Sequence, residues 1–134
     1  MFFKALEGKF IVDPVSVEAA AKDGTSCNFI HEQSFIKIDL FFVRDEIRQR
    51  QLQRSITVSL PGLSTGIKVA SAEDIILAKL SWYKKGGETS ERQWRDVLGV
   101  LKVQKGLLDI SYLESTAAAL GITPLLVRAR QQSE

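Results

Sequence analysis

The chain has 134 residues, 45% of them hydrophobic, which suits one globular domain with a core of its own. The formal net charge is only +2 and both signs are mixed along the chain, so charge indicates neither nucleic acid nor an anionic membrane as a partner. There is no apolar run of the ~20 residues that a membrane span needs, no secretory signal pattern, and only one cysteine, Cys27, so the sequence predicts a cytoplasmic protein.

The first half of the chain is predicted to mix short strands with helices. Asp13-Pro14 has the pattern of an N-cap followed by a first helical residue, and Gly24 is a typical helix stop. The elements expected, in chain order, are a helix end at 2–8, a strand at 9–12, a helix at 13–23, strands around 29 and at 35–43 joined by a polar turn at 31–34, a charged helix or loop at 44–54, and strands at 55–60 and 67–70.

From Ser71 onward the chain is predicted to be helical. Ser71 with Asp74, and Ser90 with Gln93, have the spacing of capping boxes, and Asp109 is suited to cap a third helix. A fourth helix is expected from 123. We therefore predict an α/β (α+β) fold in which a mixed sheet with flanking helices occupies 1–70. A helical lobe at 71–134 packs on it within one domain.

Asp39 breaks the local pattern, because it lies in an apolar run, 35–43, of a kind typical of a buried strand. Alternation places Lys37, Asp39 and Phe41 on one face of that strand. One interpretation is an ion pair with Lys37 or a solvated strand edge. The other is a rigidly held oxygen ligand for a divalent cation such as Mg²⁺.

Lys79 breaks the pattern of the first predicted C-terminal helix. An apolar stripe on that helix comprises Ala72, Ile75, Ile76, Leu80 and Tyr83. Lys79 falls inside the stripe, where an ammonium group must either extend to solvent or meet an anion. The anion could be a substrate phosphate or the carboxylate of Asp39.

A third group of charges opens the next helix. Arg92 and Asp96 are four residues apart and are expected to form a surface ion pair of a few tenths of a kcal/mol. Arg92 and Arg95, however, place positive charge at a helix N-terminus, against the helix dipole. That small cost indicates a nearby anion, either a carboxylate or a bound phosphate.

The segment from Ser71 to Leu113 resembles bacterial nucleotidyltransferase-like proteins of the polymerase-β-like superfamily. The residues that carry the resemblance are Ser71, Glu73, Asp74, Lys79, Gly86, Gly87, Glu91, Arg92, Gln93, Arg95 and Asp96. The stretch KIDLFF also resembles the strand that supplies the third metal-binding carboxylate of the superfamily, here Asp39. The resemblance covers nearly the whole chain.

This resemblance implies Mg²⁺-dependent transfer of a nucleotide from an NTP to an unknown acceptor. In that reaction Asp39 would ligate Mg²⁺ and Lys79 would contact the triphosphate. Arg92 and Arg95 would bind substrate, and Asp96 would orient it or brace the site.

Two features of the superfamily are missing from the sequence: the Gly-Ser turn that holds the phosphates and the Asp-x-Asp pair that holds two metal ions. One Asp cannot hold two Mg²⁺ ions, so we expect no turnover by this chain alone. An incomplete sheet would expose an edge and apolar surface, which favours a homodimer or a partner protein. The alternatives are a non-catalytic interaction module, such as a toxin–antitoxin-like component, or a fragment that begins at a mis-called start.

Overall fold

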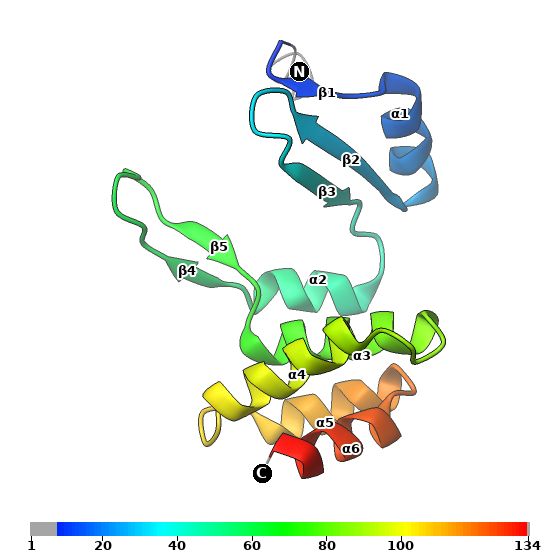
Figure 1. The fold of residues 1–134 in the computed structure, drawn as a ribbon, viewed down its shortest axis with the longest axis vertical. Coiled ribbons are helices and arrows are strands. Elements are labelled where there is room, and N and C mark those ends of the chain that lie inside the picture. Colours follow the sequence, from blue (N-terminus) through cyan, green and yellow to red (C-terminus); the bar gives the residue numbers. More distant parts are fainter. Residues whose placement is uncertain (1–7, 134) are drawn as a thin grey trace. The chain divides into compact units, whose positions relative to one another are not determined.

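The computed structural model describes residues 8–133 (Figure 1). The helix end expected at 2–8 lies outside the described residues except for Gly8. The chain divides into two units, which we call the N-terminal unit (Met1–Arg50) and the C-terminal unit (Gln51–Glu134). This division lies after Arg50, ahead of the position near residue 70 that the sequence indicated.

The N-terminal unit contains a three-stranded antiparallel sheet with the strand order β1-β2-β3. Its elements are β1 (Phe10–Ile11), α1 (Pro14–Asp23), β2 (Ser26–His31), β3 (Lys37–Phe41) and the first residues of α2 (Glu46–Gln53). As predicted, Asp13 caps α1 by accepting the N–H groups of Val15 and Ser16, and Gly24 ends the helix with φ +66°. The left-handed conformation at Gly24 suits glycine because it has no Cβ.

The core of the N-terminal unit lies between α1 and β2. Its buried side chains are Val17, Ala20, Cys27 and Phe29. β3 forms one edge of the sheet, and α1 packs mainly against β2. The apolar run at 35–43 is therefore only partly buried: Ile36 is 61% exposed and Ile38 is 44% exposed, whereas Leu40 and Phe42 pack against the core of this unit.

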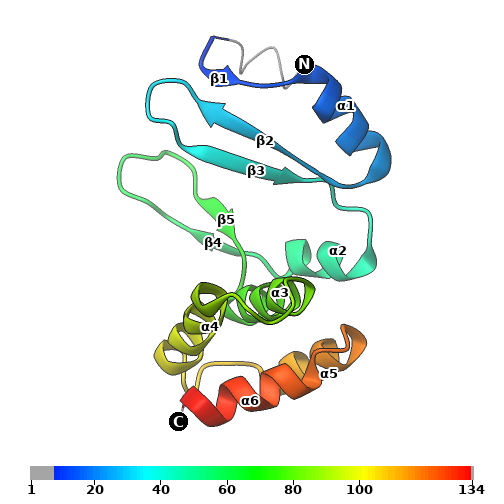
Figure 2. The ribbon, with the colours of Figure 1, turned by 45° about the vertical axis from the view of Figure 1, so that its right-hand side comes forward.

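The C-terminal unit consists of a β-hairpin and four helices (Figure 2). Its elements are β4 (Ile56–Val58), β5 (Ile67–Val69), α3 (Ala72–Lys85), α4 (Glu91–Val103), α5 (Ile110–Ala119) and α6 (Thr123–Ser133). Helix α4 packs against α3 and α6, and α5 packs against the same two helices. The predicted caps of three of these helices, Ser71, Ser90 and Asp109, are confirmed.

Twelve buried side chains form the core between the four helices of the C-terminal unit, among the residues that the structure describes. They are Ile76, Leu77, Leu80, Tyr83, Val97, Leu101, Leu113, Ala117, Ile122, Leu125, Leu126 and Ala129. Leu77 belongs to this core, although the predicted stripe on α3 omitted it. Helix α3 contacts both α4 and α5, so its buried face is wider than a single stripe.

The mixed α+β class is confirmed. The strands of the described residues do not, however, form the single mixed sheet that was expected. They form two separate antiparallel sheets, one of β1–β3 and one of β4–β5. A loop without a helix joins β2 to β3 and β4 to β5, whereas α1 lies between β1 and β2 in the chain. None of the described helices combines the length and apolarity needed to span a membrane.

Candidate functional site

The five residues singled out from the sequence lie in different units. Asp39 belongs to β3 of the N-terminal unit. Lys79 lies on α3, and Arg92, Arg95 and Asp96 lie on α4, all in the C-terminal unit. The structure therefore gathers four of the five on one pair of packed helices.

Asp39 has the lysine partner that one interpretation of the sequence named. Lys37 Nζ lies 3.1 Å from Asp39 Oδ1, and both side chains are about half exposed. The strand register places Asp39 opposite Asn28, on the face of the sheet away from the core residues Cys27 and Phe29. Within residues 8–133, no three His, Cys, Asp or Glu side chains are grouped so that they could hold a metal ion.

Lys79 joins α3 to α4. Its Nζ donates hydrogen bonds to Asp96 Oδ2 at 2.7 Å and to Gln93 Oε1 at 3.3 Å. The Lys79 side chain is 28% exposed. The positive charge of Lys79 in the apolar stripe is therefore balanced by a carboxylate of the chain itself. Hydrogen bonds of this charge-assisted kind are about twice as strong as neutral ones.

The expected ion pair between Arg92 and Asp96 is not formed, because Asp96 is engaged by Lys79 instead. The hydrogen bond from Lys79 lowers the pKa of Asp96 below 3.8, and the positive charges of Lys79, Arg92 and Arg95 act in the same direction. These four side chains therefore share one electrostatic environment. It contains three cations and one carboxylate.

A shallow depression of about 430 Å³ lies beside this group on the surface of α3 and α4. The residues that line it are Lys79, Arg95, Asp96, Gly99, Val100, Val103 and Gln104. One end of the depression is charged, and the residues further along α4 provide an apolar surface. A depression with convergent cations is suited to an anionic ligand.

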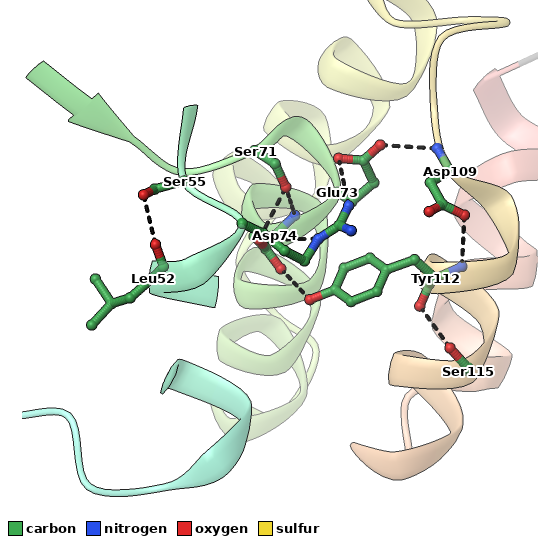
Figure 3. Close-up of polar contacts among 9 residues, drawn as sticks. Leu52, Ser55, Ser71, Glu73, Asp74, Asp109, Tyr112 and Ser115 are labelled. Carbon is green, nitrogen blue, oxygen red and sulfur yellow. Dashed lines mark hydrogen bonds and ion pairs between the residues drawn. The ribbon is translucent and has the colours of Figure 1, made fainter. Parts of the chain in front are cut away.

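A second polar cluster, which the sequence did not reveal as a unit, joins the N-termini of α3 and α5 (Figure 3). Tyr112 on α5 donates its hydroxyl to Asp74 Oδ1 at 2.6 Å. The backbone N–H of Asp109 donates to Glu73 Oε1 at 2.9 Å. Ser71 caps α3 by accepting the N–H of Asp74, and its hydroxyl donates to the carboxylate of the same residue.

Arg54 supplies the positive charge of this cluster. Its guanidinium lies 3.7 Å from the centre of the Tyr112 ring and within 4 Å of the carboxylates of Glu73 and Asp74. Arg54 Nε is buried without a hydrogen-bond partner, and its nearest carboxylate oxygen, on Asp74, is 3.9 Å away. The segment at 44–54, expected to be a charged helix or loop, forms the helix α2, and Arg54, the residue after α2, contacts the C-terminal unit.

Two groups in the cluster have altered pKa values. Burial raises the pKa of Tyr112, and its hydrogen bond to the Asp74 carboxylate raises it further. Burial also acts to raise the pKa of Glu73, but the hydrogen bond from the Asp109 N–H and the charge of Arg54 contribute to a net lowering. The raised pKa keeps the Tyr112 phenol neutral, and the lowered pKa keeps the Glu73 carboxylate ionised. The cluster ties two helix N-termini together, and its anionic groups are neutralised within the chain.

The sequence signals for this cluster were local: the Ser71–Asp74 capping box, the Asp109 cap, and the adjacent carboxylates Glu73 and Asp74. Asp74 is 2% exposed, and a buried carboxylate requires donors or a cation. The sequence does not show which of the several arginines between residues 44 and 54 would pair with Asp74. No protein-family model, curated protein or solved structure matches this chain.

Proposed function

We propose that the protein is nucleotidyltransferase-like and binds the phosphate groups of an NTP in the depression between α3 and α4. The observation that carries this proposal is the local excess of positive charge. Lys79, Arg92 and Arg95 all lower the pKa of the Asp96 carboxylate, and two of these three cations line the depression. The resemblance of Ser71–Leu113 to nucleotidyltransferase-like proteins points to the same residues.

The arrangement suits a polyphosphate for a physical reason. Asp96 and Gln93 hold the Lys79 ammonium in place before any ligand arrives, which lowers the entropy cost of binding. A phosphate oxygen would then compete with Asp96 for the ammonium. Arg95 adds a planar guanidinium that can bind two phosphate oxygens at once.

The transfer step is not assigned to this chain alone. The described residues do not fit a two-magnesium centre, because no three of their His, Cys, Asp or Glu side chains are grouped and Asp39 is paired with Lys37. In the proposal, Mg²⁺ arrives with the NTP, and Asp39 is the only ligand that the resemblance offers. A partner chain would have to supply the remaining carboxylates for nucleotide transfer.

Isothermal titration of Mg²⁺–ATP tests the binding site. Lys79→Gln and Arg95→Gln should each weaken binding about tenfold, the loss of one charge-assisted hydrogen bond. Asp96→Asn should tighten binding, because it removes the competing and repelling carboxylate. Lys102→Gln is the matched control, since Lys102 is exposed on α4 but does not line the depression. Equal affinity of all four variants and the unmodified protein would rule out this site.

The second candidate is a non-catalytic interaction module, either a homodimer or one component of a toxin–antitoxin-like pair. It is favoured by the exposed apolar side chains of two segments. Around β3 these are Phe35, Ile36, Ile38 and Phe41, and on the β4–β5 hairpin they are Ile56, Leu60, Leu63 and Ile67. Exposed strands with apolar side chains are typical pairing surfaces.

Light scattering during size-exclusion chromatography tests this second candidate. We expect the purified protein to have twice the monomer mass or to copurify with a stoichiometric partner. Ile38→Lys and Ile67→Lys, on the two segments, should each lower the measured mass if that segment forms the interface. A monomer that copurifies with nothing would count against the candidate.

A further inference from the structure

Gly99 has no explanation in the packing of the described chain. It lies in the interior of α4, where glycine is less favourable than alanine by about 1 kcal/mol. Its φ is not in the left-handed region that favours glycine, and a Cβ built at Gly99 would meet no atom within 4 Å. Neither backbone conformation nor neighbouring side chains therefore require glycine at this position.

Gly99 does, however, line the depression that holds Lys79 and Arg95. Val100 and Val103 continue the lining along α4, and the Val103 side chain is 77% exposed. Together these three residues make a low apolar surface next to the charged end. Gln104 closes the far end with an amide that can both donate and accept hydrogen bonds.

We propose that this apolar surface binds a planar ring. The ring is the base of the nucleotide whose phosphates bind at Lys79 and Arg95. This inference rests on the proposed function and assigns the other half of the same ligand. Without a side chain at Gly99, a flat ring can lie directly against the helix backbone. Val103 contacts the edge of the ring, and the Gln104 amide pairs with its polar atoms.

The spacing along α4 agrees with a ligand of this length. Asp96 and Val103 are seven residues apart, which corresponds to about 10 Å of helix at 1.5 Å per residue. A nucleoside triphosphate extends over a comparable length between its base and its terminal phosphates. Inorganic tripolyphosphate carries the same charged groups without the ring, so it separates the two halves of the site.

The experiment compares ATP with tripolyphosphate by isothermal titration in the presence of Mg²⁺. The unmodified protein should bind ATP about tenfold more tightly, because the ring removes apolar surface from water. Gly99→Ala and the larger Gly99→Leu should progressively remove that advantage and leave the affinity for tripolyphosphate unchanged. Gly99→Ala should also raise the melting temperature by a few degrees, since alanine favours the helix.

Ala118→Gly is the matched control, because Ala118 is an exposed helical residue of α5, outside the depression. It should lower the melting temperature and leave the affinity for ATP unchanged. If both ligands bind equally well and the Gly99 variants change neither affinity, the base site is overturned while the phosphate site stands. If neither ligand binds, the proposed phosphate site is overturned together with the base site.

Discussion

The two units differ in how much of their structure is supported by a core. In the described residues, four helices of the C-terminal unit enclose a cluster of twelve buried side chains. The sheet and helix of the N-terminal unit enclose only four, Val17, Ala20, Cys27 and Phe29. A small sheet with so little buried apolar surface has a marginal stability, whereas a bundle with a continuous core can be stable by itself.

The units differ in the same way in their charged groups. In the C-terminal unit, Lys79 with Asp96, and Arg54 with Glu73 and Asp74, connect separate elements of the fold. In the N-terminal unit, Lys37 and Asp39 are neighbours on one face of one exposed strand. In the N-terminal unit the guanidinium of Arg44 donates a hydrogen bond to the Ala21 carbonyl of α1, but the ion pairs of its described residues join positions at most four apart. Ion pairs therefore connect separate elements in the C-terminal unit and stay within local segments in the described N-terminal unit.

The largest effect should come from shortening the central core residue of the N-terminal unit. Phe29 is 2% exposed, and Phe29→Ala should cost about 3–5 kcal/mol, enough to unfold a core of four residues. Hydrogen exchange measured by mass spectrometry should then show loss of protection in β1–β3 while α3–α6 stay protected. Ile36→Ala is the control, because Ile36 is largely exposed. Simultaneous loss of protection in both units would contradict the inference that the two units are stabilised by separate cores.

The corresponding change in the C-terminal unit is Leu80→Ala. Leu80 is fully buried between the helices, and its truncation should cost about 2–5 kcal/mol. Both tryptophans, Trp82 and Trp94, belong to this unit, so tryptophan fluorescence during urea unfolding reports on it alone. Leu107→Ala, at a 78% exposed position, should leave the midpoint nearly unchanged. Equal midpoints for Leu80→Ala and Leu107→Ala would contradict the assigned core.

The helix boundaries of both units were largely predictable because they depend on short-range contacts. A cap such as Asp13, Ser71 or Asp109 needs only a side-chain oxygen and an N–H group two or three residues further along. The αL residue Gly24 is likewise a local requirement. These predictions are confirmed without reference to tertiary structure.

Partners across the fold were not predictable in the same way. Lys79 could be recognised as an unusual residue in an apolar stripe, but its pairing with Asp96 depends on how α3 packs against α4. Arg54 contacts Tyr112 only because α5 lies beside the N-terminus of α3. The exposure of β3 likewise depends on which strand α1 covers. Each of these facts is a consequence of packing between elements, which a single sequence does not specify.

A smaller effect should come from Arg54, whose replacement tests whether ion pairs between elements stabilise the C-terminal unit. Arg54→Met removes the cation beside Glu73 and the buried Asp74 and should destabilise the C-terminal unit by about 1–3 kcal/mol. This range is below that of a fully buried pair, because the Arg54 side chain is one-third exposed. Lys102→Met is the control, since Lys102 is an exposed cation on α4 of the same unit. Urea unfolding followed by tryptophan fluorescence measures both variants, and equal midpoints would show that Arg54 does not support the bundle.

The smallest effect should be the pH dependence of the pair between Lys79 and Asp96, which is partly exposed. The hydrogen bond from Lys79 makes the pKa of Asp96 lower in the folded chain than its ordinary value of 3.8. The stabilisation is therefore complete above 3.8 and is lost as the pH falls through the lowered pKa. Urea unfolding followed by tryptophan fluorescence should show Asp96→Asn less stable than the unmodified protein at pH 6, and the difference should shrink as the pH falls below about 4. Asp13→Asn provides the contrast between the units. The hydrogen bond from Ser16 also lowers the pKa of Asp13, but this residue lies in the N-terminal unit, so the variant should leave the fluorescence transition unchanged. A difference for Asp96→Asn that stays constant with pH would show that its carboxylate contributes by packing alone.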